Sequence, residues 1–208
     1  MADGRDVHVW DNHAQECREA ERKLFEFNPE EDSTGGWLRK KVLEVLAVED
    51  EVLDLGCGPG YWRNLFGGMN YTGFDQSQEM LQLARDLSEH EHELAWTLGN
   101  AREVDTHFGP VFEMVFMASV LQHNRHEPDK REIVEAVYKV LKPGGYFLLT
   151  ENTFRKSNCP QSVTNPDYTD GYSFTPKGWE DFLLPLGFKL LDFNGESEYL
   201  FQKVEKNG

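Results

Sequence analysis

The chain has 208 residues, 39% hydrophobic and 28% charged, which is enough for one domain with its own core and too few for two full domains. With 37 acidic and 21 basic residues its net charge is -16, a field that repels phosphate backbones and disfavours DNA or RNA as a partner. The same acidity either attracts a cationic substrate or only solvates the surface. Three widely spaced cysteines suit a reducing compartment and give no metal-site spacing, and the polar start and the lack of a long apolar run give no sign of export or of a membrane span. We therefore expect a cytoplasmic protein without a metal site, and also expect a monomer or a homodimer.

The chain begins with a segment that precedes any strand signal. Apolar residues at helical spacing predict an amphipathic helix over residues 9–27, and a polar stretch over residues 28–36 predicts a linker. The Gly35-Gly36 pair in that linker would permit movement. We therefore expect a single domain over 1–208, with residues 1–36 as an N-terminal helix and linker.

The next stretch carries the strongest motif of the chain. A helix expected over residues 38–46 leads into the apolar strand Glu51–Leu55, which stops at Gly56, Gly58 and Gly60. Such a loop has few side chains, so a ligand could touch its main-chain amides, and a helical segment over 61–68 would point its amide end at that ligand. The alternative is a plain turn from a strand to a helix.

A second strand, Tyr71–Asp75, ends on a carboxylate. Asp75 lies about 20 residues after Gly56, where doubly wound sheets place an acid over the ribose of a bound nucleotide. The glycine spacing is not the G-x-G-x-x-G of dinucleotide sites, which makes a pyrophosphate ligand the weaker interpretation.

Further strands and helices alternate along the rest of the chain. The helix after Asp75 has Ser77 as its expected N-cap, and the helix after Thr175 begins with Pro176. Residues 151–172 show no sustained periodicity, which indicates a functional or disordered insertion. Asn194-Gly195 predicts a hairpin. We expect strands over 93–98, 112–118, 146–150, 188–194 and 198–204, and helices over 77–87, 126–141 and 175–186.

These motifs carry a family resemblance. The run from Asp54 to Gly60, the acid Asp75 and the turn Leu141-Lys142-Pro143-Gly144-Gly145 resemble a class I S-adenosylmethionine-dependent methyltransferase over roughly residues 38–204. The resemblance implies an α/β fold: a doubly wound, Rossmann-like, seven-stranded and mostly parallel sheet that ends in an antiparallel hairpin.

The resemblance also implies S-adenosyl-L-methionine as the cofactor. In the family an Asp after the third strand accepts a hydrogen bond from the adenine; Asn100 replaces it here, and its amide oxygen can accept the same bond or simply form a turn. The cofactor-binding residues expected from the motif positions are Asp54, Gly56, Cys57, Gly58, Gly60, Asp75, Gln76, Met80, Asn100, Ala101, Met117 and Ala118.

The acceptor side is less defined. His123, which follows the fourth strand, is our first candidate for a base and His13 the second, although either can be a packing residue. In the family the leading helix often covers the cofactor, so Trp10 would contact the substrate together with Tyr168 and Tyr172 of the insertion 151–174; packing on the sheet and local anchoring are the alternatives. We expect methyl transfer to an O or N atom of a small molecule, with a protein or peptide amine methyltransferase and a non-catalytic nucleotide-binding regulator as alternatives.

Overall fold

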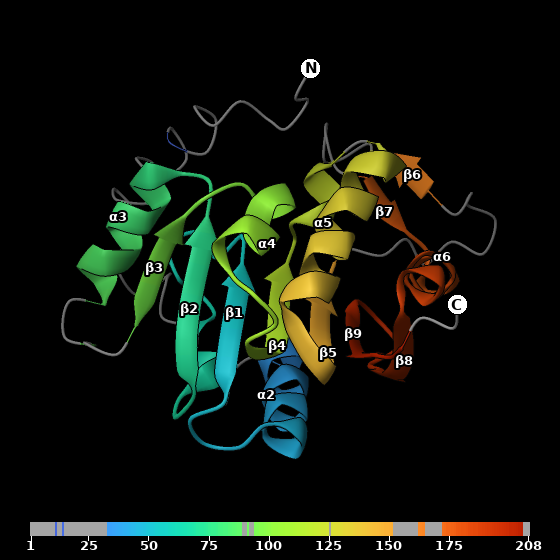
Figure 1. Cartoon of the computed structure of the whole chain (residues 1–208), viewed down its shortest axis with the longest axis horizontal. Coiled ribbons are helices and arrows are strands. Elements are labelled where there is room, and N and C mark those ends of the chain that lie inside the picture. The colour runs from blue at the N-terminus through green and yellow to red at the C-terminus, as the bar shows by residue number, and fades with distance from the viewer. Residues whose placement is uncertain are drawn as a thin grey trace.

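A seven-stranded sheet lies at the centre of the molecule, in the order β3-β2-β1-β4-β5-β9-β8 (Figure 1). The computed structural model describes residues 11, 14, 33–88, 91, 94–124, 126–151, 162–164 and 172–205. β1 to β5 run parallel, and β9 pairs antiparallel with both β5 and β8, which confirms the expected fold. The strands of this sheet are β1 (Glu51–Leu55), β2 (Asn70–Asp75), β3 (Ala95–Leu98), β4 (Phe112–Ala118), β5 (Leu141–Thr150), β8 (Phe188–Phe193) and β9 (Glu198–Lys203).

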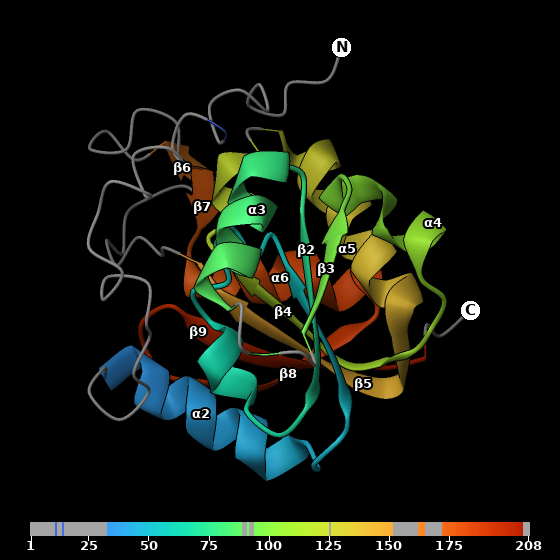
Figure 2. The ribbon, with the colours of Figure 1, turned by 90° about the vertical axis from the view of Figure 1, so that its left-hand side faces the viewer.

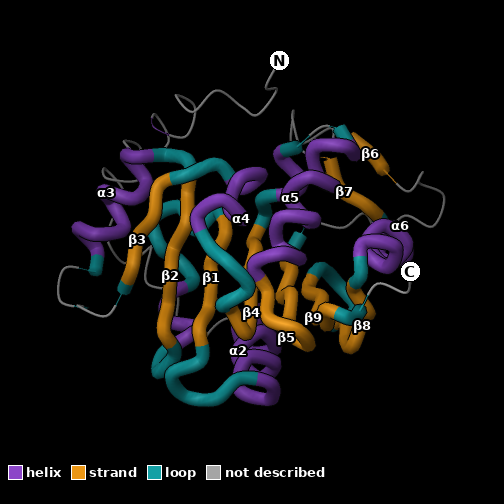
Figure 3. Tube along the Cα trace, viewed as in Figure 1, coloured by secondary structure: helices purple, strands orange, loops and turns teal. Residues whose placement is uncertain are grey.

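Helices cover both faces of the sheet. Figure 2 shows α2 (Ser33–Val45) and α3 (Gln78–Leu87) on one side, and α4 (Val104–His107) and α5 (Glu127–Val140) on the other. Successive strand side chains point to opposite faces, so Val52 packs in the cluster with Leu38 of α2, whereas Leu53 packs in the cluster with Ile133 of α5. Figure 3 shows the strands enclosed between these helical layers. No helix in the described ranges is long and apolar enough to cross a membrane.

The expected caps and turn are present. The Ser77 hydroxyl accepts from the amide of Met80 at 3.1 Å, and the Thr175 hydroxyl accepts from the amide of Gly178 at 3.1 Å at the start of α6 (Pro176–Leu183). In the hairpin, the Asn194 side chain accepts from the amides of Glu196 and Ser197 at 2.8 and 3.0 Å. These local bonds fix where the helices begin and where the last two strands reverse.

Several boundaries differ from the sequence-based expectation. β5 begins at Leu141 instead of Tyr146, so the turn expected over 141–145 lies within a strand. α2 already begins at Ser33, so the expected linker over 28–36 overruns into its first turn, and Gly35-Gly36 lies in a helix rather than a hinge. The segment after Gly60 forms only the short 3-10 helix Arg63–Phe66. The insertion 151–174 includes a small two-stranded sheet, β6 (Ser162–Thr164) with β7 (Tyr172–Phe174), because pairing between the strands supplies the order that periodicity did not show.

Candidate cofactor and acceptor site

The carboxyl ends of the parallel strands bring the predicted residues to one edge of the sheet. The amide of Gly56, after β1, donates to the carbonyl of Phe74 in β2 at 2.7 Å. The amide of Gly99, after β3, donates to the carbonyl of Asp75 at 2.9 Å. The glycine loop, Asp75 and the Asn100 corner are therefore neighbours, at the edge where open α/β sheets bind ligands.

The glycine loop has a backbone that only glycine adopts without strain. Gly56, Gly58 and Gly60 have φ angles of 81, 53 and 75°. A Cβ on Gly56 would lie 2.4 Å from the Cγ2 of Val120, and one on Gly60 would lie 2.5 Å from the Trp96 ring. A Cβ on Gly58 would meet nothing within 4 Å, so this glycine faces open space where a ligand can approach the backbone.

The amides of this loop are hydrogen-bonded within the protein, and the predicted contact of the loop with a cofactor stays a prediction. Gly56 and Cys57 donate to the Phe74 carbonyl at 2.7 and 3.2 Å, and Gly60 donates to the Cys57 carbonyl at 3.0 Å. The Gly58 amide donates to Asp75 Oδ2 at 2.9 Å. A pyrophosphate needs free amide donors. This loop therefore suits a ligand that packs against it through van der Waals contacts.

Asp75 is the polar group that a nucleoside would meet beside the loop. Its carboxylate accepts from the amides of Gly58 and Ser77, each at 2.9 Å, and has a third backbone hydrogen bond, with Gln76, so three of about four acceptor positions are used. Burial raises the pKa of this half-buried side chain, and the backbone hydrogen bonds oppose that rise. The remaining acceptor position fits a ribose hydroxyl, so the residues present fit the adenosine part of S-adenosylmethionine.

Asp54 and Cys57 lie beneath the loop. The Asp54 side chain is 1% exposed and accepts from the Tyr71 hydroxyl at 2.7 Å. Burial raises the pKa of Asp54 to about 7, while the Tyr71 hydrogen bond lowers it and the nearby Asp75 raises it. Burial also raises the pKa of the Cys57 thiol. Their packing supports the loop, and their predicted contact with the cofactor stays a prediction.

The other predicted cofactor residues divide into exposed and buried groups. Asn100 is exposed, and its side-chain oxygen accepts from the amide of Arg102 at 3.0 Å, which is the turn-forming alternative. Met80 and Met117 are 4% and 0% exposed, so their side chains belong to the core. Gln76, Ala101 and Ala118 are partly exposed at the same edge.

The predicted acceptor residues are only partly placed. His123 ends the 3-10 helix Leu121–His123 directly after β4, is partly exposed, and its amide donates to the Val120 carbonyl at 3.1 Å. This puts His123 at the carboxyl edge, on the β4 side of the glycine loop. Trp10, His13 and Tyr168 lie outside the described residues, as does the side chain of Tyr172 in β7.

Sequence reasoning missed two buried charged residues beside His123. Glu151, directly after β5 and 1% exposed, accepts from the amides of Leu121 and Gln122 at 2.7 and 3.1 Å. Lys130, in α5 and 2% exposed, donates to the carbonyl of Leu121. Burial raises the pKa of Glu151 to about 7 and lowers that of Lys130 to about 8, while their mutual attraction opposes both shifts. The position of Glu151, just past a buried parallel strand, was the available signal.

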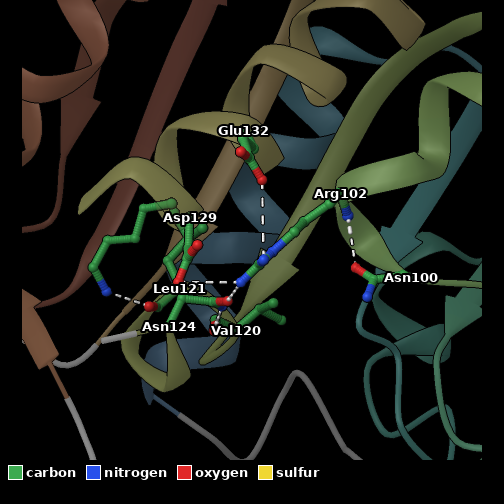
Figure 4. A network of polar contacts seen from close by, with 8 residues as sticks. Asn100, Arg102, Val120, Leu121, Asn124, Asp129 and Glu132 are labelled. Carbon is green, nitrogen blue, oxygen red and sulfur yellow. Dashed lines mark hydrogen bonds and ion pairs between the residues drawn. The ribbon is translucent and has the colours of Figure 1, made fainter. Parts of the chain in front are cut away.

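Arg102 was also missed, and it joins the loops after β3 and β4. Its guanidinium lies 3.2 Å from Asp129 and 3.9 Å from Glu132 of α5, and it donates to the Asn124 side chain at 3.4 Å (Figure 4). Asn124 in turn donates to the Val120 carbonyl at 3.1 Å. The segment that carries His123 is thus held from the β3 side as well as from α5.

Comparisons with known proteins agree with this geometry. A family model described as a methyltransferase domain matches residues 52–145. A ubiquinone biosynthesis O-methyltransferase from Alkalilimnicola ehrlichii is 29% identical over 140 residues, covering 64% of this chain and 55% of the relative. A malonyl-[acyl-carrier protein] O-methyltransferase from Salmonella typhimurium is 32% identical over 149 residues, covering 63% and 54%.

Solved structures share the fold at low identity. A SAM-dependent methyltransferase from Methanosarcina mazei has a TM-score of 0.62 at 20% identity and covers 79% of this chain and 97% of its own. The SAM-bound amino pentose methyltransferase CalS10 from Micromonospora echinaspora has a TM-score of 0.63 at 15% identity and covers 81% and 89%. The chain spans about half the length of the curated relatives that it matches. Residues 52–145 of the chain thus match the methyltransferase-domain family, and the motif and the sheet order are those of a class I S-adenosylmethionine-dependent methyltransferase.

Proposed function

We propose that the chain transfers a methyl group from S-adenosylmethionine to an oxygen or nitrogen atom of a small molecule. The observation that carries the proposal is the pairing of Asp75, which keeps an acceptor position for a ribose hydroxyl, with a glycine loop whose amides are bonded within the protein. When bound, the cofactor supplies an activated methyl group on a sulfonium, which leaves the sulfur as a neutral thioether. The protein's main task is then to align the two reactants, which is worth roughly 7 to 11 kcal/mol.

The strand order supports a place for the acceptor. Asp75 and the glycine loop, on β2 and β1, fill one half of the carboxyl edge, so an acceptor in line with the methyl group would approach over β4 and β5. His123 follows β4 there, and we propose that it takes the proton that an oxygen or ammonium acceptor must lose. The O-methyltransferase names of the curated relatives favour oxygen, and the name of the amino pentose methyltransferase favours a small acceptor. A peptide amine acceptor and a non-catalytic role are the alternatives.

The N-terminal segment is proposed to cover this site. Asp11 accepts from the Ser77 hydroxyl at 2.6 Å, two residues from Asp75, and Ala14 is fully buried. Closing segments exclude water and complete acceptor pockets. Deleting residues 1–27 should leave cofactor binding intact and reduce turnover steeply. A truncated protein that is less stable but turns over normally below its melting temperature would reduce the segment to scaffold.

Two measurements test the proposed function. Titration calorimetry should detect S-adenosylmethionine and S-adenosylhomocysteine and show weaker or no binding of NAD; tighter binding of NAD would refute the cofactor assignment. Labelled cofactor incubated with a metabolite library and a peptide library should then place the label on a small molecule. Label on peptides alone would favour the peptide amine alternative, and no transfer with firm binding would favour the regulator. The cytoplasmic location stays a prediction.

A further inference from the structure

The six residues after β4, Ser119–Asn124, link the two halves of the site. We call them the post-β4 segment. Val120 packs on the glycine loop, since a Cβ on Gly56 would lie 2.4 Å from its Cγ2, and His123, the proposed base, ends the 3-10 helix of the same segment. The conformation of these few residues therefore affects both reactants.

This segment is held only partly by its own bonds, in which the amides of His123 and Asn124 donate to the carbonyls of Val120 and Leu121 at 3.1 and 3.0 Å. Ser119 has a φ of 57°, a left-handed conformation that strains a non-glycine residue and persists only where the surroundings impose it. The 3-10 helix that follows has only three residues, with no side-chain cap of its own. The strained start of the segment at Ser119 therefore depends on contacts from elsewhere in the chain.

Those contacts come chiefly from one buried carboxylate. Glu151 accepts from the consecutive amides of Leu121 and Gln122, and the Ser119 amide donates to the carbonyl of Thr150, the residue before Glu151, at 2.8 Å. Lys130 bonds the Leu121 carbonyl and provides the opposite charge to Glu151. Burying a carboxylate is costly unless it is paired and hydrogen-bonded, and the Glu151 side chain interacts with backbone amides of this segment and with the charge of Lys130.

We propose that Glu151, paired with Lys130, is a positioning residue that sets the post-β4 segment for methyl transfer. It acts through the segment: it holds Val120 against the glycine loop and His123 at the acceptor side. The part about His123 rests on the proposed function; the part about the segment and the cofactor loop does not.

The chain offers a matched control at the opposite edge of the sheet. Glu113, in β4, also accepts from a backbone amide, that of Glu51 at 2.8 Å, and also pairs with a lysine, Lys142. Glu113→Gln therefore changes the same kind of contact far from the proposed site. Glu151→Gln keeps the volume of the side chain but can accept from only one of the two amides without presenting its own NH2 group to the other.

The test compares Glu151→Gln, Lys130→Met, the double variant and Glu113→Gln. Each single change in the buried pair should lower the melting temperature, because it leaves one buried charge uncompensated, and the double variant should recover much of that loss. Hydrogen exchange by NMR on the cofactor-free protein should show the Leu121 or Gln122 amide exchanging at least tenfold faster in Glu151→Gln and in the double variant. In Glu113→Gln the amide of Glu51 should exchange faster, and the amides of Leu121 and Gln122 should exchange at the wild-type rate.

Cofactor affinity then separates positioning from stability. S-adenosylhomocysteine, measured by calorimetry, should bind about 5- to 20-fold more weakly to the double variant despite its recovered stability, and within twofold of wild type to Glu113→Gln. Once an acceptor is known, the kcat of the double variant should fall more than its KM changes. Unchanged exchange of the Leu121 and Gln122 amides, or unchanged affinity in the double variant, overturns the inference. Failure of the wild-type protein to bind S-adenosylhomocysteine instead refutes the proposed function and leaves the exchange result to decide the conformational claim.

Discussion

The two halves of the carboxyl edge are held in different ways. On the cofactor half, the loop after β1 is fixed by short backbone bonds to β2 and by the carboxylate of Asp75. On the acceptor half, the post-β4 segment is fixed by buried or partly buried charged side chains, Glu151, Lys130 and Arg102, that come from three other elements. The first half depends on residues that lie within a short stretch of sequence or in the adjacent strand, and the second depends on a network.

The difference has a physical consequence for tolerance to change. A backbone-fixed loop tolerates little at its glycines, because its φ angles are positive and a Cβ has no room at two of the three. A network of charged side chains couples its members, so single substitutions leave uncompensated charges while paired substitutions are milder. The following predictions test or refine this contrast, beginning with the largest effect.

Gly56→Ala should be the most damaging single change on the cofactor half. The positive φ and the contact with Val120 together should cost roughly 2 to 5 kcal/mol of unfolding free energy. Gly58→Ala, the control, shares the positive φ but has open space for its Cβ, so its cost should be about 1 to 2 kcal/mol. Adding Val120→Ala should recover part of the Gly56→Ala loss. Denaturant unfolding measures all three, and equal losses for the two glycines would contradict the contact.

Asp54→Asn should flatten the dependence of stability on pH. The pKa of Asp54 is raised to about 7, so between about pH 4 and pH 7 the folded state keeps a proton that the unfolded chain releases. Stability therefore falls as the pH rises through that window, and Asp54 contributes roughly 2 to 3 kcal/mol of the fall between pH 5 and pH 8. Buried Glu151 and Glu198, whose pKa values are also raised, add falls of the same sign that remain in the variant. An unaltered pH profile in urea titrations would show that Asp54 is ionised at lower pH.

Asp75→Ala should weaken the binding of S-adenosylhomocysteine by about 1.5 to 3 kcal/mol, since it removes a charged acceptor for the ribose. It also frees the amides of Gly58 and Ser77. Asp75→Asn, which keeps one acceptor, should lose less. Calorimetry at one salt concentration compares them, and unchanged affinity in the alanine variant would mean that another group holds the ribose.

The smallest effect is expected at Asn100. If its side chain contacts the adenine edge, Asn100→Asp should keep cofactor affinity, since both side chains accept, and Asn100→Leu should lose about 1 kcal/mol. Both variants also test the hydrogen bond from the Arg102 amide to the side chain of residue 100, which Asp can accept and Leu cannot. Calorimetry reports the adenine contact and thermal unfolding reports the turn. A Leu variant with lower stability but normal cofactor affinity would leave Asn100 as a turn former only.

The cofactor half could be predicted from sequence because its determinants are local. The spacing of Gly56, Gly58 and Gly60 and the acid at the end of the next strand follow from periodicity and backbone rules. The seven-stranded order came from the family resemblance together with the Asn194-Gly195 hairpin. Local rules could not predict which groups accept hydrogen bonds from the loop amides, because the acceptors, Phe74 and Asp75, lie on the neighbouring strand.

The acceptor half could not be predicted in the same way. Glu151 meets Leu121 across 30 positions of sequence, and Arg102 meets Asn124 across 22. Charged residues in single sequences are assigned to the surface by default, so nothing marked Lys130 as buried. The early start of α2 at Ser33 was missed for a different reason: Gly35 and Gly36 suggest a break, and tertiary contacts overrode that local preference.

The close approach of Gly56 and Val120 also constrains how the family can diverge. If position 56 gains a side chain while position 120 is still valine, the resulting protein is overpacked. If position 120 becomes smaller first, the resulting protein has only a small cavity. We therefore expect the substitution at position 120 to precede the one at position 56 in evolution. Among relatives that carry alanine at the position of Gly56, we expect alanine or glycine at that of Val120, a pairwise dependence that an alignment of the family can count.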